Sequence, residues 1–130
     1  MLKWKDDYLL GIKIIDEQHK RLFEISDRAF RLVVEKDDKE RNKKFFDILK
    51  ELISYTDYHF EFEENYMKSK NYKHFEEHKK LHIEFKKVIS NYELDIDDEN
   101  IGEVTTKVAK LLVEWLINHI MVQDKLYIEH

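Results

Sequence analysis

The sequence contains almost nothing that would interrupt a helix. Its 130 residues include no proline and only two glycines, the residues that destabilise a helix interior most. Charged residues make up 39% of the chain, which is typical of long helices with polar outer faces. A chain of this length is expected to form one domain around one core. These features predict a single all-α domain over residues 1–130.

Apolar residues recur with a helical period in four segments, each bounded by turn-forming residues. The expected helices are at about residues 16–36, 39–68, 72–92 and 101–120. Short connections favour an antiparallel, up-down-up-down four-helix bundle. Asp16 is the expected N-cap of the first helix. Residues 1–15 are expected to form an irregular N-terminal arm that packs Trp4 and Tyr8 against the bundle.

Composition argues against several classes of protein. Without cysteine, the chain has no disulfide, thiolate metal ligand or cysteine nucleophile, which fits a reducing compartment. Asp6 and Asp7 interrupt the stretch where a secretory signal would be apolar, and apolar runs fall far short of the roughly 20 residues of a membrane span. A net charge of −5 with interleaved signs argues against a nucleic-acid surface. We expect a cytoplasmic protein that neither inserts into membranes nor binds nucleic acid.

Five of the seven histidines stand at metal-ligand spacings, together with two carboxylates. Imidazole nitrogen and carboxylate oxygen together suit iron, zinc or manganese. Because helix direction alternates, the start of the first and third helices and the end of the second and fourth lie at one end of the bundle. The candidate ligands would all meet there, in a two-metal site. The predicted metal ligands are His19, His59, Glu63, His74, His78, His119 and Asp124.

Two of the spacings suit a regular helix. His59 and Glu63 are four residues apart, as are His74 and His78, so each pair lies on one helix face. His82 continues the four-residue series but falls at the edge of the inward face. We expect His82 to be exposed or to support a ligand, and not to bind metal itself.

The spacing of His119 and Asp124 demands an irregular helix. Five residues leave the two side chains about 140° apart on an ideal α-helix. If both bind metal, the chain must loosen into a π-type turn, or leave the helix, between them. The sequence therefore predicts a break in helical regularity at this point.

The ligand set leaves room for one small molecule. With both carboxylates and one oxygen atom bridging two octahedral metals, one coordination position stays open. Its helical neighbours are apolar and offer no spare acid or base, so proton transfer there should be slow. The residues expected to line this position are Leu22, Trp115, Leu116 and Met121.

Five segments together resemble the hemerythrin family, in particular its single-domain bacterial branch. They are Trp4 in the arm, DEQHK around His19, HFEFEE from His59, HFEEH from His74, and WLINHIMVQDKLY from Trp115 to Tyr127. The resemblance covers nearly the whole chain. It implies a four-helix bundle that holds a non-haem di-iron centre, two iron ions (Fe2+/Fe3+) with a bridging oxo or hydroxo group.

The resemblance also implies a role for each ligand. One iron would take His74, His78 and His119, the other His19 and His59, with Glu63 and Asp124 bridging. The two-histidine iron would keep the open position and bind O2 reversibly as peroxide, which makes the apolar lining an O2 pocket. The implied function is that of an O2 carrier, store or deliverer to an oxygen-consuming enzyme, and not that of an enzyme.

Three alternatives remain open at this point. A di-iron enzyme could act as an oxidase or peroxidase or reduce nitric oxide, but ferritin-type enzymes use Glu-rich sites with Glu-x-x-His pairs, which this ligand set lacks. An O2 or redox sensor would need a signalling domain or partner. A metal-free bundle would bury imidazoles and carboxylates at a cost of several kcal/mol for each unpaired ion.

Overall fold

The computed structural model describes residues 3–129; the first two residues of the expected arm, and His130, lie outside it. The long helices are α1 (Lys13–Leu32), α2 (Asp38–Ser69), α3 (Phe75–Asp95) and α4 (Ile101–Asn118). The shorter elements are a 3-10 turn η1 (Asp6–Tyr8), a π-helix η2 (His119–Asp124) and α5 (Lys125–Glu129). Over the described residues every regular element is helical.

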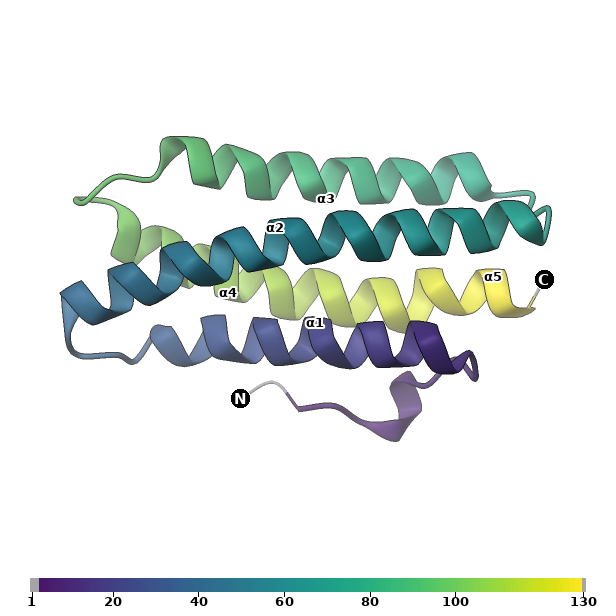
Figure 1. Ribbon diagram of the computed structural model, residues 1–130, viewed down its shortest axis with the longest axis horizontal. Coiled ribbons are helices and arrows are strands. Elements are labelled where there is room, and N and C mark those ends of the chain that lie inside the picture. Colours follow the sequence, from purple (N-terminus) through teal and green to yellow (C-terminus); the bar gives the residue numbers. More distant parts are fainter. Residues whose placement is uncertain (1–2, 130) are drawn as a thin grey trace.

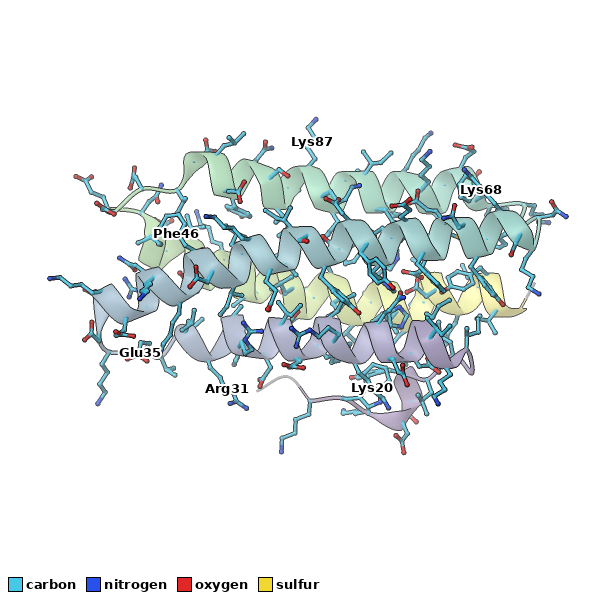
Figure 2. The ribbon with its side chains drawn as sticks, viewed as in Figure 1. Lys20, Arg31, Glu35, Phe46, Lys68 and Lys87 are labelled. Atoms are coloured by element: carbon cyan, nitrogen blue, oxygen red, sulfur yellow. The ribbon has the colours of Figure 1, made fainter. Side chains whose placement is uncertain are left out.

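The long helices form an antiparallel four-helix bundle, as the sequence predicts (Figure 1). α1 packs against α2 and α4, and α2 packs against α3. η2 and α5 continue the line of α4 along α1 and α2 (Figure 1). Charged side chains such as Lys87 on α3 project away from the bundle (Figure 2). No helix within residues 3–129 combines the length and apolarity needed to cross a membrane.

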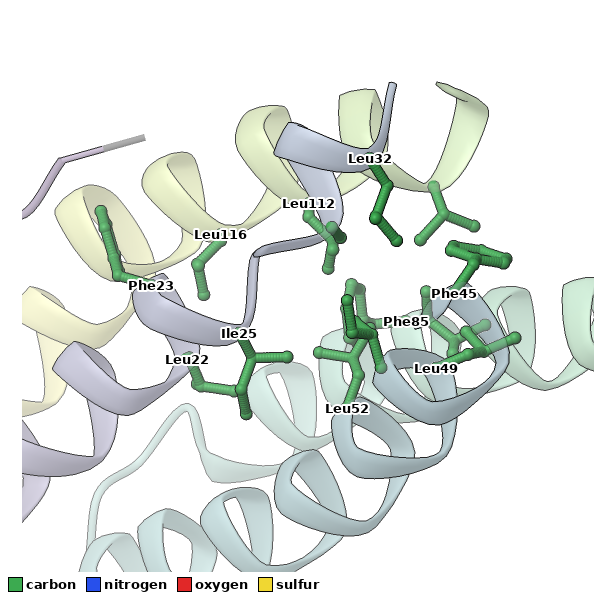
Figure 3. Close-up of a cluster of buried hydrophobic side chains, with 14 of the residues drawn as sticks. Leu22, Phe23, Ile25, Leu32, Phe45, Leu49, Leu52, Phe85, Leu112 and Leu116 are labelled. Atoms are coloured by element: carbon green, nitrogen blue, oxygen red, sulfur yellow. The ribbon is translucent and has the colours of Figure 1, made fainter. Parts of the chain in front are cut away.

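The core lies along the bundle axis and fills it with aliphatic and aromatic side chains from all four long helices (Figure 3). Ile25 of α1, Leu52 of α2 and Leu112 of α4 are each at most 1% exposed, and Phe85 of α3 is 4% exposed. Removing such surface from water contributes about 25 cal/mol for each Å². This packing holds the helices at the spacing on which the polar cluster described below depends.

The N-terminal arm packs on α1 through aromatic rings. The Trp4 ring centroid lies 5.4 Å from that of Tyr8 and 5.1 Å from that of Phe23, both in edge-to-face geometry. Edge-to-face pairs at this separation contribute about 0.5–1.5 kcal/mol beyond the area that they bury. The expected packing of the arm aromatics against the bundle is therefore observed.

Asp16 was expected to begin the first helix, but α1 already begins at Lys13. The carboxylate of Asp16 instead accepts hydrogen bonds from the backbone N–H of Leu10, at 2.7 Å, and of Gly11, at 3.1 Å. Gly11 has a φ of 91°, in the left-handed region that glycine adopts without strain. Asp16 thus fastens the arm to the first turn of α1.

The connection between α2 and α3 is short. It determines which residues of α3 lie at the same level of the bundle axis as a given residue of α2. α2 ends at Ser69, and Asn71 takes a φ of 55°, a left-handed conformation that asparagine tolerates better than most residues. Tyr72 then turns inward and is 7% exposed. α3 begins at Phe75, three residues later than the sequence pattern predicts.

Candidate metal centre

Seven polar side chains meet inside the bundle, toward the end at which α2 turns into α3. They form two groups whose possible ligand atoms lie within 4.8 Å of one another, and each residue is at most 3% exposed. One group is His78, His82, His119 and Asp124, and the other is His19, His59, Glu63 and Asp124. Every long helix contributes to this cluster directly or, for α4, through η2, which follows it.

The structure corrects the expected contribution of α3. His74 is the N-cap residue of that helix, its side chain is 53% exposed, and its Nδ1 lies 3.8 Å from the exposed carboxylate of Glu77. His82, expected to lie outside the ligand set, is fully buried within it. The pair that faces the cluster from α3 is therefore His78 and His82, because the helix starts later than its apolar pattern suggests.

The predicted irregularity between His119 and Asp124 is observed. Residues His119–Asp124 form a π-helix between the α-helical segments α4 and α5. Hydrogen bonds of the i to i+5 type place residues five apart on one face, where an α-helix would separate them. As a result, His119 Nε2 lies 3.0 Å from Asp124 Oδ1. The π-helix is the local structure that brings both side chains to the cluster.

Asp124 contacts both groups of the cluster. Its Oδ1 is 3.0 Å from Nε2 of both His78 and His119, and its Oδ2 is 3.1 Å from Nε2 of His19. Glu63 is likewise central: its Oε1 is 2.5 Å from His59 Nε2 and 3.9 Å from Nε2 of both His19 and His82. Two carboxylates in such positions are suited to bridge two metal ions.

Mutual charge interactions fix the protonation of this cluster in the metal-free protein. Burial works to lower the pKa of His19, but its close contacts with Asp124 and Glu63 outweigh burial and raise that pKa to about 9. Burial works to raise the pKa of both carboxyls, yet the surrounding imidazoles hold each pKa well below its usual range. Both carboxylates are thus anions, and a metal bound by His19 would displace its proton.

The cluster also contains polar atoms that the protein itself leaves unsatisfied. Nε2 of His19 and His78, Oε1 of Glu63 and both carboxylate oxygens of Asp124 are buried without a hydrogen bond of acceptable geometry. Nε2 of His82 faces Nε2 of His119 at 3.1 Å. Buried polar atoms normally have partners, so this convergence of lone pairs is costly unless a cation lies among them. The donor set fits a metal pair bound by nitrogen and oxygen.

Three residues that were not predicted from the sequence make hydrogen-bond contacts with residues of the cluster. Gln18 Oε1 lies 2.7 Å from His59 Nδ1, and Glu64 Oε2 lies 2.9 Å from His82 Nδ1. The Tyr127 hydroxyl donates to Glu63 Oε2 at 2.7 Å. Gln18 and Glu64 are each next in sequence to a cluster residue, so adjacency was the available signal for them.

The residues predicted to line an O2 pocket lie in or against the apolar core, and one of them, Trp115, contacts the cluster. Leu22 and Leu116 are 2% and 4% exposed in the apolar core. Trp115 is half-buried and stacks on His119, with ring centroids 4.2 Å apart and planes 10° from parallel. Met121 packs against the same core. Their surroundings are apolar, and their role as a pocket stays a prediction.

Together the fold and the cluster define a helical bundle built around two adjoining groups of histidines and carboxylates, each of which could hold a metal ion. Residues 10–130 match the family model of the hemerythrin HHE cation binding domain. The chain is 33% identical to bacteriohemerythrin from Clostridium acetobutylicum over 129 residues, covering 99% of this chain and all of the relative. It is 30% identical to myohemerythrin from Theromyzon tessulatum over 125 residues, covering 96% of this chain and 89% of that one. This chain belongs to the hemerythrin family.

Proposed function

We propose that this protein binds O2 reversibly at a non-haem di-iron centre and acts as a carrier, store or deliverer of O2. The observation that carries the proposal is the convergence of five imidazoles and two carboxylates in two adjoining groups that share Asp124. Membership of the hemerythrin family, with relatives named bacteriohemerythrin and myohemerythrin, supports iron as the metal. We further propose a cytoplasmic location and an oxygen-consuming enzyme as the recipient.

The geometry supports a revised assignment of ligands. We assign His78, His82 and His119 to one iron, His19 and His59 to the other, and both bridging positions to Glu63 and Asp124. Replacing His74 by His82 leaves the number of ligands unchanged. One position would therefore stay open, on the iron that His19 and His59 would hold. The two irons, when bound, can together give two electrons to O2 and recover them when O2 leaves.

The protein contributes a dry environment and no free acid at this position. Leu22 and Leu116 exclude water on the side of the core, and Trp115 shields His119. The Tyr127 hydroxyl already donates its proton to Glu63. Burial, and then the charge of Glu63, also raise the pKa of the Tyr127 phenol, which makes it a poor acid toward bound oxygen. Loss of oxygen as hydrogen peroxide should therefore be slow. This favours reversible binding over turnover.

The test is a stopped-flow optical experiment on the reduced, iron-loaded protein. Mixing with O2 should produce a ligand-to-iron charge-transfer band that disappears on deoxygenation and returns on re-exposure over several cycles. Immediate decay to the oxidised protein, with release of peroxide or water, would instead identify a di-iron oxidase or peroxidase. If the only effect of oxidation were a change in the affinity of this protein for another protein, the protein would be a sensor.

A further inference from the structure

The two groups of the cluster are supported from outside by partners of different charge. Behind His82, on the three-histidine side, stands the carboxylate of Glu64, with Oε2 2.9 Å from Nδ1. Behind His59, on the two-histidine side, stands the neutral amide of Gln18, with Oε1 2.7 Å from Nδ1. The contacts are otherwise alike, since each joins an oxygen to the ring nitrogen that faces away from the carboxylate cluster.

Both contacts fix the same imidazole tautomer. An oxygen acceptor at Nδ1 keeps the ring proton there and leaves Nε2 free to bind a metal. In this structure Nε2 of His59 faces Glu63, and Nε2 of His82 faces His119 and Glu63. Orientation alone, therefore, does not distinguish the two sides. The difference between them is electrostatic.

The carboxylate behind His82 changes the donor strength of the ring. A charged acceptor makes a hydrogen bond roughly twice as strong as a neutral one, and it draws the Nδ1 proton away from the imidazole. The Nε2 lone pair becomes more basic as a result. Glu64 itself is largely buried, with a side chain 19% exposed, so solvent screens its charge only in part. Gln18, 4% exposed, supplies no such charge.

We propose that Glu64 and Gln18 are positioning residues that make the two metal positions unequal. Supported by Glu64, the position bound by His78, His82 and His119 is the tighter one and fills first. The position bound by His19 and His59, where Gln18 adds no charge, is the weaker one and favours the lower oxidation state. This inference rests on the proposed two-metal function, and it assigns the cause of the asymmetry to two residues that do not bind metal.

The test is an anaerobic titration of the metal-free protein with Co2+, followed by its optical absorption. We expect two binding steps of different affinity. Glu64→Gln keeps an oxygen acceptor for His82 but removes the charge, and should weaken the tighter step by about tenfold or more. Gln18→Glu should tighten the weaker step. The matched control is Glu61→Gln, which makes the same chemical change at an exposed position of α2 and should change neither step.

A second measurement separates an electrostatic role from a merely structural one. In the iron-loaded protein, Glu64→Gln should raise the midpoint potential and Gln18→Glu should lower it, since a negative charge stabilises ferric iron. If Glu64→Gln changes the tighter step no more than Glu61→Gln does, the inference is wrong. If Glu64→Gln does not fold, a Gln18→Glu protein with an unchanged weaker step refutes it equally. If the unaltered protein binds fewer than two metals, the proposed function fails instead.

Discussion

At the scale of single residues, the burial of Glu63 and Asp124 is the feature that most needs a counter-charge. Both side chains are fully buried, and moving a carboxylate out of water costs several kcal/mol even after the protein relaxes. The protonated imidazole of His19 offsets part of this cost, and a cation bound between the carboxylates and the imidazoles would offset more. Tyr127 contributes the one hydrogen bond of ordinary geometry described for either carboxylate.

Replacing Tyr127 with phenylalanine should destabilise the protein by about 1.5–3 kcal/mol, the usual contribution of a hydrogen bond to a charged group. Burial, and then the negative charge of Glu63, raise the pKa of the Tyr127 phenol, so it remains a donor at any physiological pH. Urea unfolding of the metal-free protein measures the change. Tyr58→Phe is the control, because Tyr58 is 56% exposed. Equal effects of the two substitutions would contradict the assigned role.

His74 and His82 can be distinguished by metal content. His82→Ala removes a buried ligand and should lose metal from the His78, His82 and His119 position. His74→Ala changes an exposed side chain and should keep two metal ions per chain. Elemental analysis after dialysis measures both. The reverse result would restore His74 as the ligand.

At the scale of elements, the regularity and the ends of the helices determined which parts of the cluster could be predicted from the sequence. The spacing of His119 and Asp124 predicted that, if both bind metal, the chain forms a π-type turn or leaves the helix between them, and the structure has a π-helix there. The start of α3 could not be read from apolar periodicity, because Tyr72 is buried in the turn before the helix and extends the pattern toward the N-terminus. His82 was set aside because it falls at the edge of the inward face of an ideal helix, whereas in the structure it is fully buried in the cluster.

The π-helix should be the least stable part of the path from α4 to α5 when the metals are absent. His119 and Asp124 contact each other across its widened turn, and a metal bound by both would hold that turn in place. Hydrogen exchange read by mass spectrometry should therefore show slower exchange over residues 119–124 after Zn2+ is added. A peptide covering residues 104–112 of α4 serves as the control. Unchanged exchange over 119–124 would show that metal does not hold the turn.

At the scale of the whole molecule, the all-α bundle was predictable because two features of the sequence both indicate helices. They are the near absence of helix-breaking residues and the helical period of the apolar residues. The level of the ligands along α3 depends on the boundary that the sequence pattern did not provide. In the structure the connection between α2 and α3 is centred on residue 72, so Glu63 and Leu81 are each nine residues from its centre. His82 adjoins that level, and His74 does not. Gln18 and Glu64 contact histidines of the cluster that lie on other helices. These contacts depend on side-chain rotamers, which no sequence pattern specifies.

The metal-free protein should lose stability in mildly alkaline solution. His19 has a pKa raised from 6.5 to about 9, so its contribution is complete below pH 6.5 and is lost as pH rises to about 9. The shift corresponds to roughly 3 kcal/mol at most. Urea unfolding in the presence of a chelator, repeated from pH 6 to pH 10, measures the decline. His19→Gln should flatten it, and an equally steep decline in that variant would assign the effect to another group.

The position of Asp124 has a consequence for how the protein assembles. Because its oxygens contact histidines of α1 and α3 as well as His119, neither group of the cluster is complete until α4 and η2 have docked. A chain whose last helices are detached would offer two half-built sites of low affinity. If the proposed metals bind, their release and the undocking of this final segment would therefore be one cooperative event.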